Sequence, residues 1–122
     1  MLGAEIVDQV NWCSVGHSWW NWSFGANWSS DGTKITNNGN GGNCIAAGRW
    51  SITKKYRTIS SVVFRSGTDV IPIWDGTTVN QIVFHSGRYI NYYQPGGTYL
   101  YIQSEVCDCD ITELSVKEIL MP

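Results

Sequence analysis

The stretch ITELSVKEI, residues 111–119, decides the fold through the phase of its apolar positions. Alternation along a β-strand places Leu114 and Val116 on one face, because successive side chains point to opposite sides. The isoleucine that opens the stretch is out of phase with that pair. One extra residue, at Thr112 or Glu113, would form a β-bulge and return this isoleucine to the shared face. The stretch therefore predicts a bulged strand with one buried face.

The rest of the chain consists of similar short runs, rich in β-branched and aromatic residues and separated by Gly, Asn and Asp clusters. Helical periodicity is nearly absent. Turn signals lie between the runs, among them Asp31-Gly32, Ser66-Gly67 and Asp75-Gly76. The expected strands are Glu5–Val10, His17–Phe24, Lys34–Asn37, Asn43–Ala47, Ile52–Phe64, Val70–Trp74, Val79–His85, Tyr89–Tyr93, Tyr99–Gln103 and Ile111–Ile119. Many short strands at this spacing favour a sandwich or barrel over βαβ units.

The run Tyr99–Gln103 alternates simply. We expect Leu100 and Ile102 to point inward and the tyrosines to lie outward or at the rim, although alternation alone also permits the opposite assignment.

Length and composition set further bounds. The 122 residues fit one domain, residues 1–122, with no repeat or linker. Only 15% of residues are charged, and the formal net charge is −2 without a basic patch, which argues against nucleic acid as a partner. The start MLGAEIVDQV lacks the pattern of a signal peptide, and no run is long enough to span a membrane. We expect synthesis in the cytoplasm and no membrane partner.

Four cysteines stand at Cys13, Cys44, Cys107 and Cys109, and three pairings are possible if all form disulfides. Free, mostly buried thiols are the first expectation without a secretory signal. Disulfides formed after release into an oxidising medium are the second. A zinc site is the least favoured, because the Cys-Asp-Cys spacing lacks the two-residue gap of a zinc knuckle.

Five of the seven tryptophans fall within NWCSVGHSWWNWSFGANW, residues 11–28. Most of them are expected to fill the core or a subunit interface, and one or two could stack on sugar rings. The candidates for binding a glycan or a partner protein are Trp19, Trp22, Trp74 and Tyr92. An exposed aromatic patch anchors a protein as well as a sugar, so the residue types leave both uses open.

Six motifs carry a family resemblance through their order and spacing. They are LGAEIV (Leu2–Val7), WSSDGTKI (Trp28–Ile35), KKYR (Lys54–Arg57), GRY (Gly87–Tyr89), LYIQS (Leu100–Ser104) and LSVKEI (Leu114–Ile119). With them the chain resembles the small jelly-roll domains, related to carbohydrate-binding modules, that recur in tailed-phage virion proteins. The resemblance implies an all-β jelly-roll sandwich of two antiparallel sheets with about 8–10 short strands.

In related modules an acidic residue of the last strand helps to hold a structural calcium ion. The family's Asp-Asn is Thr112-Glu113 here, so Asp110 or Glu113 would have to act together with Glu5. We therefore expect no cofactor and no metal, with calcium as the minor alternative.

Catalysis is not expected. His17 and His85 lie in no nucleophile or metal-ligand motif, and no pair of carboxylates is fixed by a motif. The resemblance implies instead a virion structural protein that is a complete gene product, assembles in the host cytoplasm and lies on the virion surface. We expect it to decorate the capsid, tail or fibre by binding major capsid or tail proteins, as a homo-oligomer such as a trimer. The alternative is a module that attaches the particle to host or environmental glycans.

Overall fold

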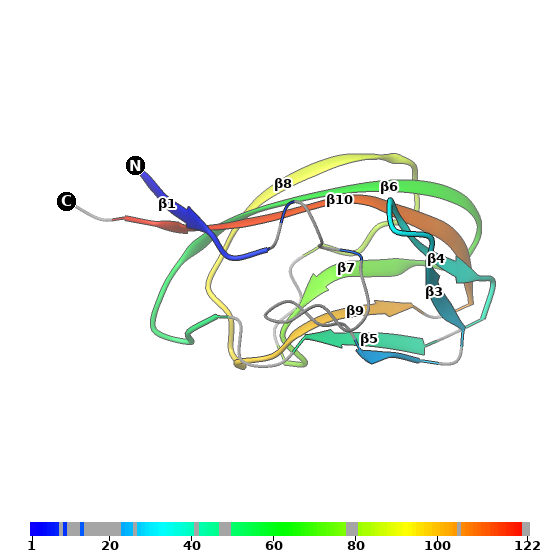
Figure 1. Cartoon of the computed structure of the whole chain (residues 1–122), viewed down its shortest axis with the longest axis horizontal. Helices are drawn as coiled ribbons and strands as arrows, with labels where there is room; N and C mark the ends of the chain where they lie inside the picture. Colours follow the sequence, from blue (N-terminus) through cyan, green and yellow to red (C-terminus); the bar gives the residue numbers. More distant parts are fainter. Residues whose placement is uncertain are drawn as a thin grey trace.

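The computed structural model of the chain describes residues 1–7, 9, 13, 23–25, 27–40, 42–46, 50–77, 81–104 and 106–120, with the backbone alone at 23–24 and 43–46. Two antiparallel sheets face each other (Figure 1). Their strands are β1 (Leu2–Glu5), β2 (Ser23–Phe24), β3 (Trp28–Ser30), β4 (Ile35–Asn38), β5 (Gly42–Ala46), β6 (Tyr56–Gly67), β7 (Val70–Trp74), β8 (Gly87–Tyr93), β9 (Leu100–Ser104) and β10 (Cys107–Ile119). None of the described residues belongs to a helix that could cross a membrane.

The strand order is that of a jelly roll. One sheet has six strands in the order β3-β4-β10-β6-β8, with β1 beside β10, and the other has four in the order β2-β5-β9-β7. Val83 extends the second sheet through a single bridge to Val70 in β7. From β4 to β10 every connection between consecutive strands crosses from one sheet to the other, as in the two Greek keys of a jelly roll. The predicted all-β sandwich of two antiparallel sheets is confirmed.

The long strands β6 and β10 form the centre of the larger sheet and pair at eleven positions. Their register steps from Ile111 opposite Val62 to Glu113 opposite Ser61, so Thr112 is the extra residue of a bulge. The three apolar residues that the sequence pattern placed on one face are each at most 1% exposed: Ile111, Leu114 and Val116. The bulge predicted from the sequence is confirmed. Because of it, apolar residues on both sides of Thr112 face the core.

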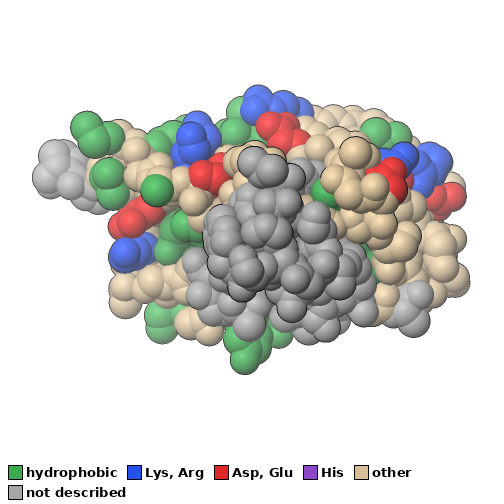
Figure 2. All heavy atoms as spheres, in the orientation of Figure 1, with side chains coloured by type: hydrophobic (Ala, Val, Ile, Leu, Met, Phe, Trp, Pro, Cys, Tyr) green, Lys and Arg blue, Asp and Glu red, His purple; other side chains and the backbone are tan. Residues whose placement is uncertain are grey.

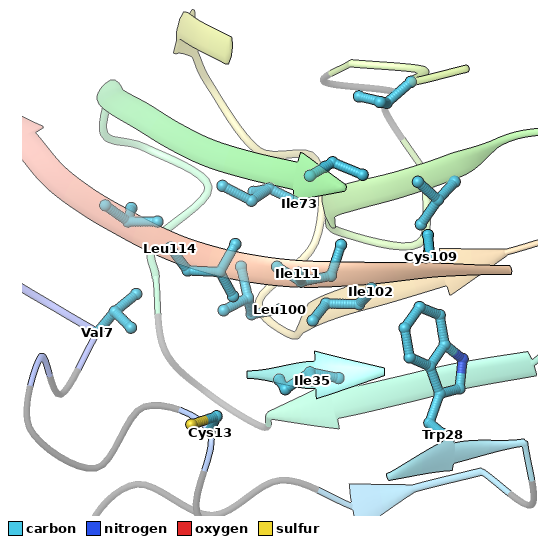
Figure 3. Close-up of a cluster of buried hydrophobic side chains, with 14 of the residues drawn as sticks. Val7, Cys13, Trp28, Ile35, Ile73, Leu100, Ile102, Cys109, Ile111 and Leu114 are labelled. Atoms are coloured by element: carbon cyan, nitrogen blue, oxygen red, sulfur yellow. The ribbon is translucent and has the colours of Figure 1, made fainter. Parts of the chain in front are cut away.

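The core lies between the two sheets (Figure 3). Leu100 and Ile102 of β9 are fully buried, as predicted, while Tyr99 is 48% exposed on the other side. Trp28 and Trp50 are each 5% exposed and belong to the core, in line with the main expectation for the tryptophans. The Trp50 indole N–H donates to the Tyr99 carbonyl at 3.0 Å, which satisfies its polar edge inside the protein.

The N-terminal segment closes a gap along β10. Strand β4 pairs with residues 108–111 of β10 and β1 pairs near its end, so no described strand pairs with the backbone of β10 between them, apart from the bond of Ile6 N to the Val116 carbonyl. The Glu5 carboxylate accepts hydrogen bonds from Val116 N, at 2.6 Å, and from the Ser115 hydroxyl. The Gln9 side-chain amide donates to the Leu114 carbonyl at 2.7 Å. Side chains thus replace strand pairing at this edge.

Several predicted strand boundaries are wrong. Strand β1 ends at Glu5, where the prediction of Glu5–Val10 begins, because the Glu5 carboxylate takes the β10 donors that the next residues of a strand would bond. Asp8 and Val10 of the predicted strand lie outside the described residues. Strand β3 was not predicted, although the Asp31-Gly32 turn that follows it was. Strand β6 begins after Lys55 and runs through the predicted turn to Gly67. This glycine has a φ of 114°, and a Cβ there would lie 2.2 Å from the Val106 carbonyl oxygen.

The predicted strand Val79–His85 is reduced to the bridge at Val83 within its described part, 81–85. Val83 is 1% exposed, whereas Ile82 and Phe84 on either side are 44% and 55% exposed. This segment passes from the β7 edge to the β8 edge, so it contributes one inward residue instead of a ladder. Of the predicted strand His17–Phe24, only Ser23–Phe24 is described, as β2.

Three of the four cysteines are free and buried: Cys13, Cys107 and Cys109. Burial raises the pKa of each of these thiols, most strongly at Cys109, so all three are poor nucleophiles. The prediction of free, buried thiols is confirmed at these positions, and the Cys44 side chain lies outside the described residues.

Two single-residue deletions in β10 test whether the bulge sets the register between β6 and β10. Deletion of Thr112 should leave a folded protein, with a free energy of unfolding changed by about 1 kcal/mol or less, because the remaining residues keep their inward and outward directions. Deletion of Ser115 should abolish folding, since it turns Val116 outward and Lys117 inward. Circular dichroism and urea denaturation measure both variants. Equal damage from the two deletions would contradict this account of the bulge.

Candidate functional site

Charge is divided unequally between the two sheets. The strands of the four-stranded sheet, β2, β5, β7 and β9, contain no Asp, Glu, Lys or Arg. All charged strand residues belong to the six-stranded sheet. In Figure 2 the six-stranded sheet is at the top of the view, and red and blue side chains lie along it and at the left-hand end. Green, hydrophobic side chains lie along the lower edge of the view. The strands of the four-stranded sheet therefore place no charged side chain on its outer face; Asp69, a described carboxylate before β7, lines a small cleft with Ile71 and Gln103.

An aromatic cluster lies on this outer face. Trp74 of β7 pairs with Tyr101 of β9, and their ring centroids are 5.8 Å apart. Tyr99 contacts Tyr101 edge to face, with centroids 6.2 Å apart. Trp74 and Tyr101 are half-buried, while Tyr99 is exposed. We call these three residues the aromatic face; Ile71 and Gln103, paired with each other, extend it along the same strands.

The loops beside the aromatic face are held by a buried carboxylate. Asp75 follows Trp74 and is 4% exposed. Its oxygens accept from Thr77 N at 2.7 Å and from Gly96 N, which joins the loop after β7 to the turn before β9. The Tyr93 hydroxyl bonds the same carboxylate, and burial together with Asp75 raises the pKa of Tyr93. The aromatic face is thus built on a fixed frame rather than on a free loop.

Close glycine contacts complete this frame. Gly76 has a φ of 89°, which favours glycine, and a Cβ there would lie 3.1 Å from the Tyr101 ring, a tight contact that would push the loop and the ring apart. A Cβ on Gly97 would lie 2.6 Å from the Asp75 carbonyl oxygen. These approaches fix the distance between the loops and the Tyr101 ring.

The structure separates the predicted binding residues. Trp74 belongs to the aromatic face, but Tyr92, 73% exposed, lies on the outer face of the opposite sheet. Trp19 and Trp22 lie outside the described residues. Tyr99 and Tyr101 were not singled out as site residues. Their alternation with buried leucine and isoleucine, in a stretch without charge, is the signal that could have identified them.

The outer face of the six-stranded sheet carries ion pairs instead. Arg65 donates to Asp108 at 2.7 Å and to Asp110 at 2.8 and 3.1 Å, and Lys34 reaches Asp110 at 3.3 Å. Arg88 donates to Glu113 at 2.9 Å. These pairs cross neighbouring strands, and they give each of these carboxylates a cationic partner from the protein.

The acidic residues considered as calcium ligands already accept hydrogen bonds from protein donors. Asp110 is bound by Arg65 and Lys34, Glu113 by Arg88 and Ser61, and Glu5 by donors of β10. The described residues contain no group of three or more His, Cys, Asp or Glu that could hold a metal ion. The oxygens considered for calcium therefore bind protein N–H and O–H groups at three separate places.

Asp110 is the most strongly perturbed of these carboxylates. Hydrogen bonds from Arg65, and further bonds from Thr36 and Lys34, lower the pKa of Asp110 to about 2, against a smaller opposing effect of burial. An unfolded Asp titrates near 3.9. The folded state therefore binds this proton less tightly than the unfolded state does, and ionised Asp110 stabilises the fold above the unfolded pKa.

This linkage predicts a pH dependence of stability. The contribution of Asp110, about 2 kcal/mol, should be complete above about pH 4 and be lost as the pH falls through about 2. Asp110→Asn should lower the free energy of unfolding at pH 7 by a similar amount and flatten its decline between about pH 4 and pH 2. Urea denaturation at a series of pH values measures both effects.

Asp108→Asn is the matched control. It removes the other carboxylate that binds Arg65. The Asp108 side chain is 40% exposed, against 9% for that of Asp110, so water screens the ion pair between Asp108 and Arg65. This variant should keep the acid-dependent loss. If it flattened the pH profile as much as Asp110→Asn, the assignment to Asp110 would be wrong.

No protein-family model matches the chain, and no curated protein or solved structure shows significant similarity to it. The likeness to phage jelly-roll domains therefore stays a prediction from sequence motifs, while the fold rests on the strand order described above.

Proposed function

We propose that this protein is a non-enzymatic adhesion protein of a phage particle, which binds neighbouring shell or tail subunits through the outer face of its four-stranded sheet and stabilises the particle. The observation that carries the proposal is the uncharged sheet with its outward aromatic face. The phage setting comes from the sequence resemblance alone.

The chemistry of the aromatic face suits contact with another protein. The buried centres of protein interfaces are depleted in charge and enriched in Tyr and Trp, which supply most of the binding energy. Tyr99, 48% exposed, would be the residue that inserts most deeply into a partner. The frame around Asp75 holds its neighbours in place, so little conformational entropy is lost on binding.

The geometry favours a protein partner over a sugar. A pyranose ring stacks on a flat aromatic surface, and several rings bind a glycan chain best when they share one plane. The interplanar angle is 54° between Trp74 and Tyr101 and 65° between Tyr99 and Tyr101. These rings therefore offer edges and tilted faces. Glycan binding remains the second candidate because the Gln103 amide lies on the same face and could bond hydroxyl groups.

A binding experiment with whole particles tests the proposal. Purified protein is mixed with particles that lack it, and both the saturating stoichiometry and the heat stability of the particles are measured. We expect a fixed number of copies per particle and raised heat stability. Tyr99→Ser combined with Tyr101→Ser should lower the affinity by about 1,000-fold, since each hot-spot aromatic contributes about 2 kcal/mol and about 1.4 kcal/mol corresponds to a factor of ten.

Tyr92→Ser is the matched control, because it removes an exposed tyrosine from the opposite sheet and should leave particle binding unchanged. Absence of particle binding, together with retention on a polysaccharide column that Trp74→Ala abolishes, would replace the adhesion proposal with the glycan-binding one.

A further inference from the structure

One row across the outer face of the six-stranded sheet places two cations side by side. Arg57 of β6 lies directly opposite Lys117 of β10. The row continues to Tyr92 of β8 beside Arg57 and to Glu5 of β1 beside Lys117. Like charges directly opposite each other destabilise a sheet, so this arrangement needs a compensating role.

Neither cation has a partner in the described part of the chain. Lys34, Lys54, Arg65 and Arg88 form ion pairs there, whereas Arg57, Lys117 and the nearby Lys55 form none. Glu5, the carboxylate next to Lys117 in the row, instead accepts hydrogen bonds from Ser115 and Val116. The positive charge of this row is thus left for a ligand.

The Arg57 guanidinium is also incompletely bonded. Its Nε atom is buried and has no hydrogen-bond acceptor among the described residues. A buried donor without an acceptor is costly, and native structures rarely keep one without a reason. Because Nε is closed to solvent, a ligand would bind the two Nη groups, which offer a second pair of parallel N–H donors to a carboxylate, sulfate or phosphate.

We propose that Arg57 and Lys117 form a binding site for an oxyanion, either free or carried by a ring that lies against Tyr92. Tyr92 is 73% exposed and Ile90, two residues earlier on the same face, is 51% exposed, so both present apolar surface beside the cations. Lys55, two residues before Arg57, lines an open cleft of 380 Å³ that gives a larger ligand room at this end of the sheet. This site is independent of the aromatic face, which lies on the other sheet.

Thermal unfolding in the presence of anions tests the site. The full chain is titrated with sulfate, phosphate, acetate and glucuronate at constant ionic strength, with chloride as the reference. Saturable binding should raise the melting temperature by about 5 °C or more, and calorimetry should give a stoichiometry near one ligand per chain. If glucuronate raises the melting temperature more than acetate does, and Tyr92→Ala removes the difference, the sugar ring contacts Tyr92. If both anions raise the melting temperature equally, the site binds the anion alone.

Two variants separate this site from general salt effects. Lys117→Gln should raise the melting temperature in anion-free buffer, because it removes the repulsion, and at the same time lower anion affinity by at least 10-fold. Arg57→Lys keeps the charge but loses the forked donor, and it should weaken binding by a similar factor. Arg88→Gln, on the same face but paired with Glu113, should keep the anion response. If all three variants respond to anions as the original chain does, the proposal is wrong.

Discussion

The pairing of β6 with β10 is the constraint on which the rest of the structure depends. These strands run side by side at eleven positions, and the remaining strands of their sheet are added to their outer edges. Residues about fifty positions apart in sequence must meet before this ladder exists, which makes its closure entropically demanding. The bulge at Thr112 lies within the same ladder, so a local irregularity sets which side chains of the longest strand enter the core.

The two outer faces that result are chemically different. The larger sheet is covered by ion pairs that link adjacent strands, with Arg65 and Asp110 at their centre. The smaller sheet has no charged strand residue and presents tilted aromatic rings. Ion pairs exposed to water contribute little to stability and keep a surface well hydrated, whereas an uncharged aromatic surface gains from losing its water. The two proposed binding surfaces thus lie on different sheets.

Alternation and turn chemistry predicted much of this fold. The phase error in residues 111–119 located the bulge, and the alternation around Leu100 and Ile102 oriented β9. What alternation could not predict were the places where side chains replace strand pairing. Strand β1 stops at Glu5 because a carboxylate bonds the neighbouring backbone, and Val83 forms a single bridge because its segment crosses between sheets.

The sites were harder to predict for the same reason. Trp74 was identified from its residue type and its position at a loop end, but its neighbour Tyr101 becomes a partner only when β7 and β9 pair. The opposed cations Arg57 and Lys117 are sixty positions apart and become neighbours only through the register of β6 and β10. Sequence patterns show which face a residue takes, and not which residues from other strands share that face.

The two ends of the chain lie together at one pole of the long axis (Figure 1), where Leu120 N bonds the Met1 carbonyl. The aromatic face belongs to β7, β9 and the turn before β9, whereas Lys117 lies beside Glu5 of β1, close to the two ends. A short peptide could therefore join the two ends and new ends could be opened at an exposed turn, such as Asp31-Gly32, without disturbing the aromatic face. The fold is in this sense suited to circular permutation, and a cargo fused at either end would emerge from the same pole.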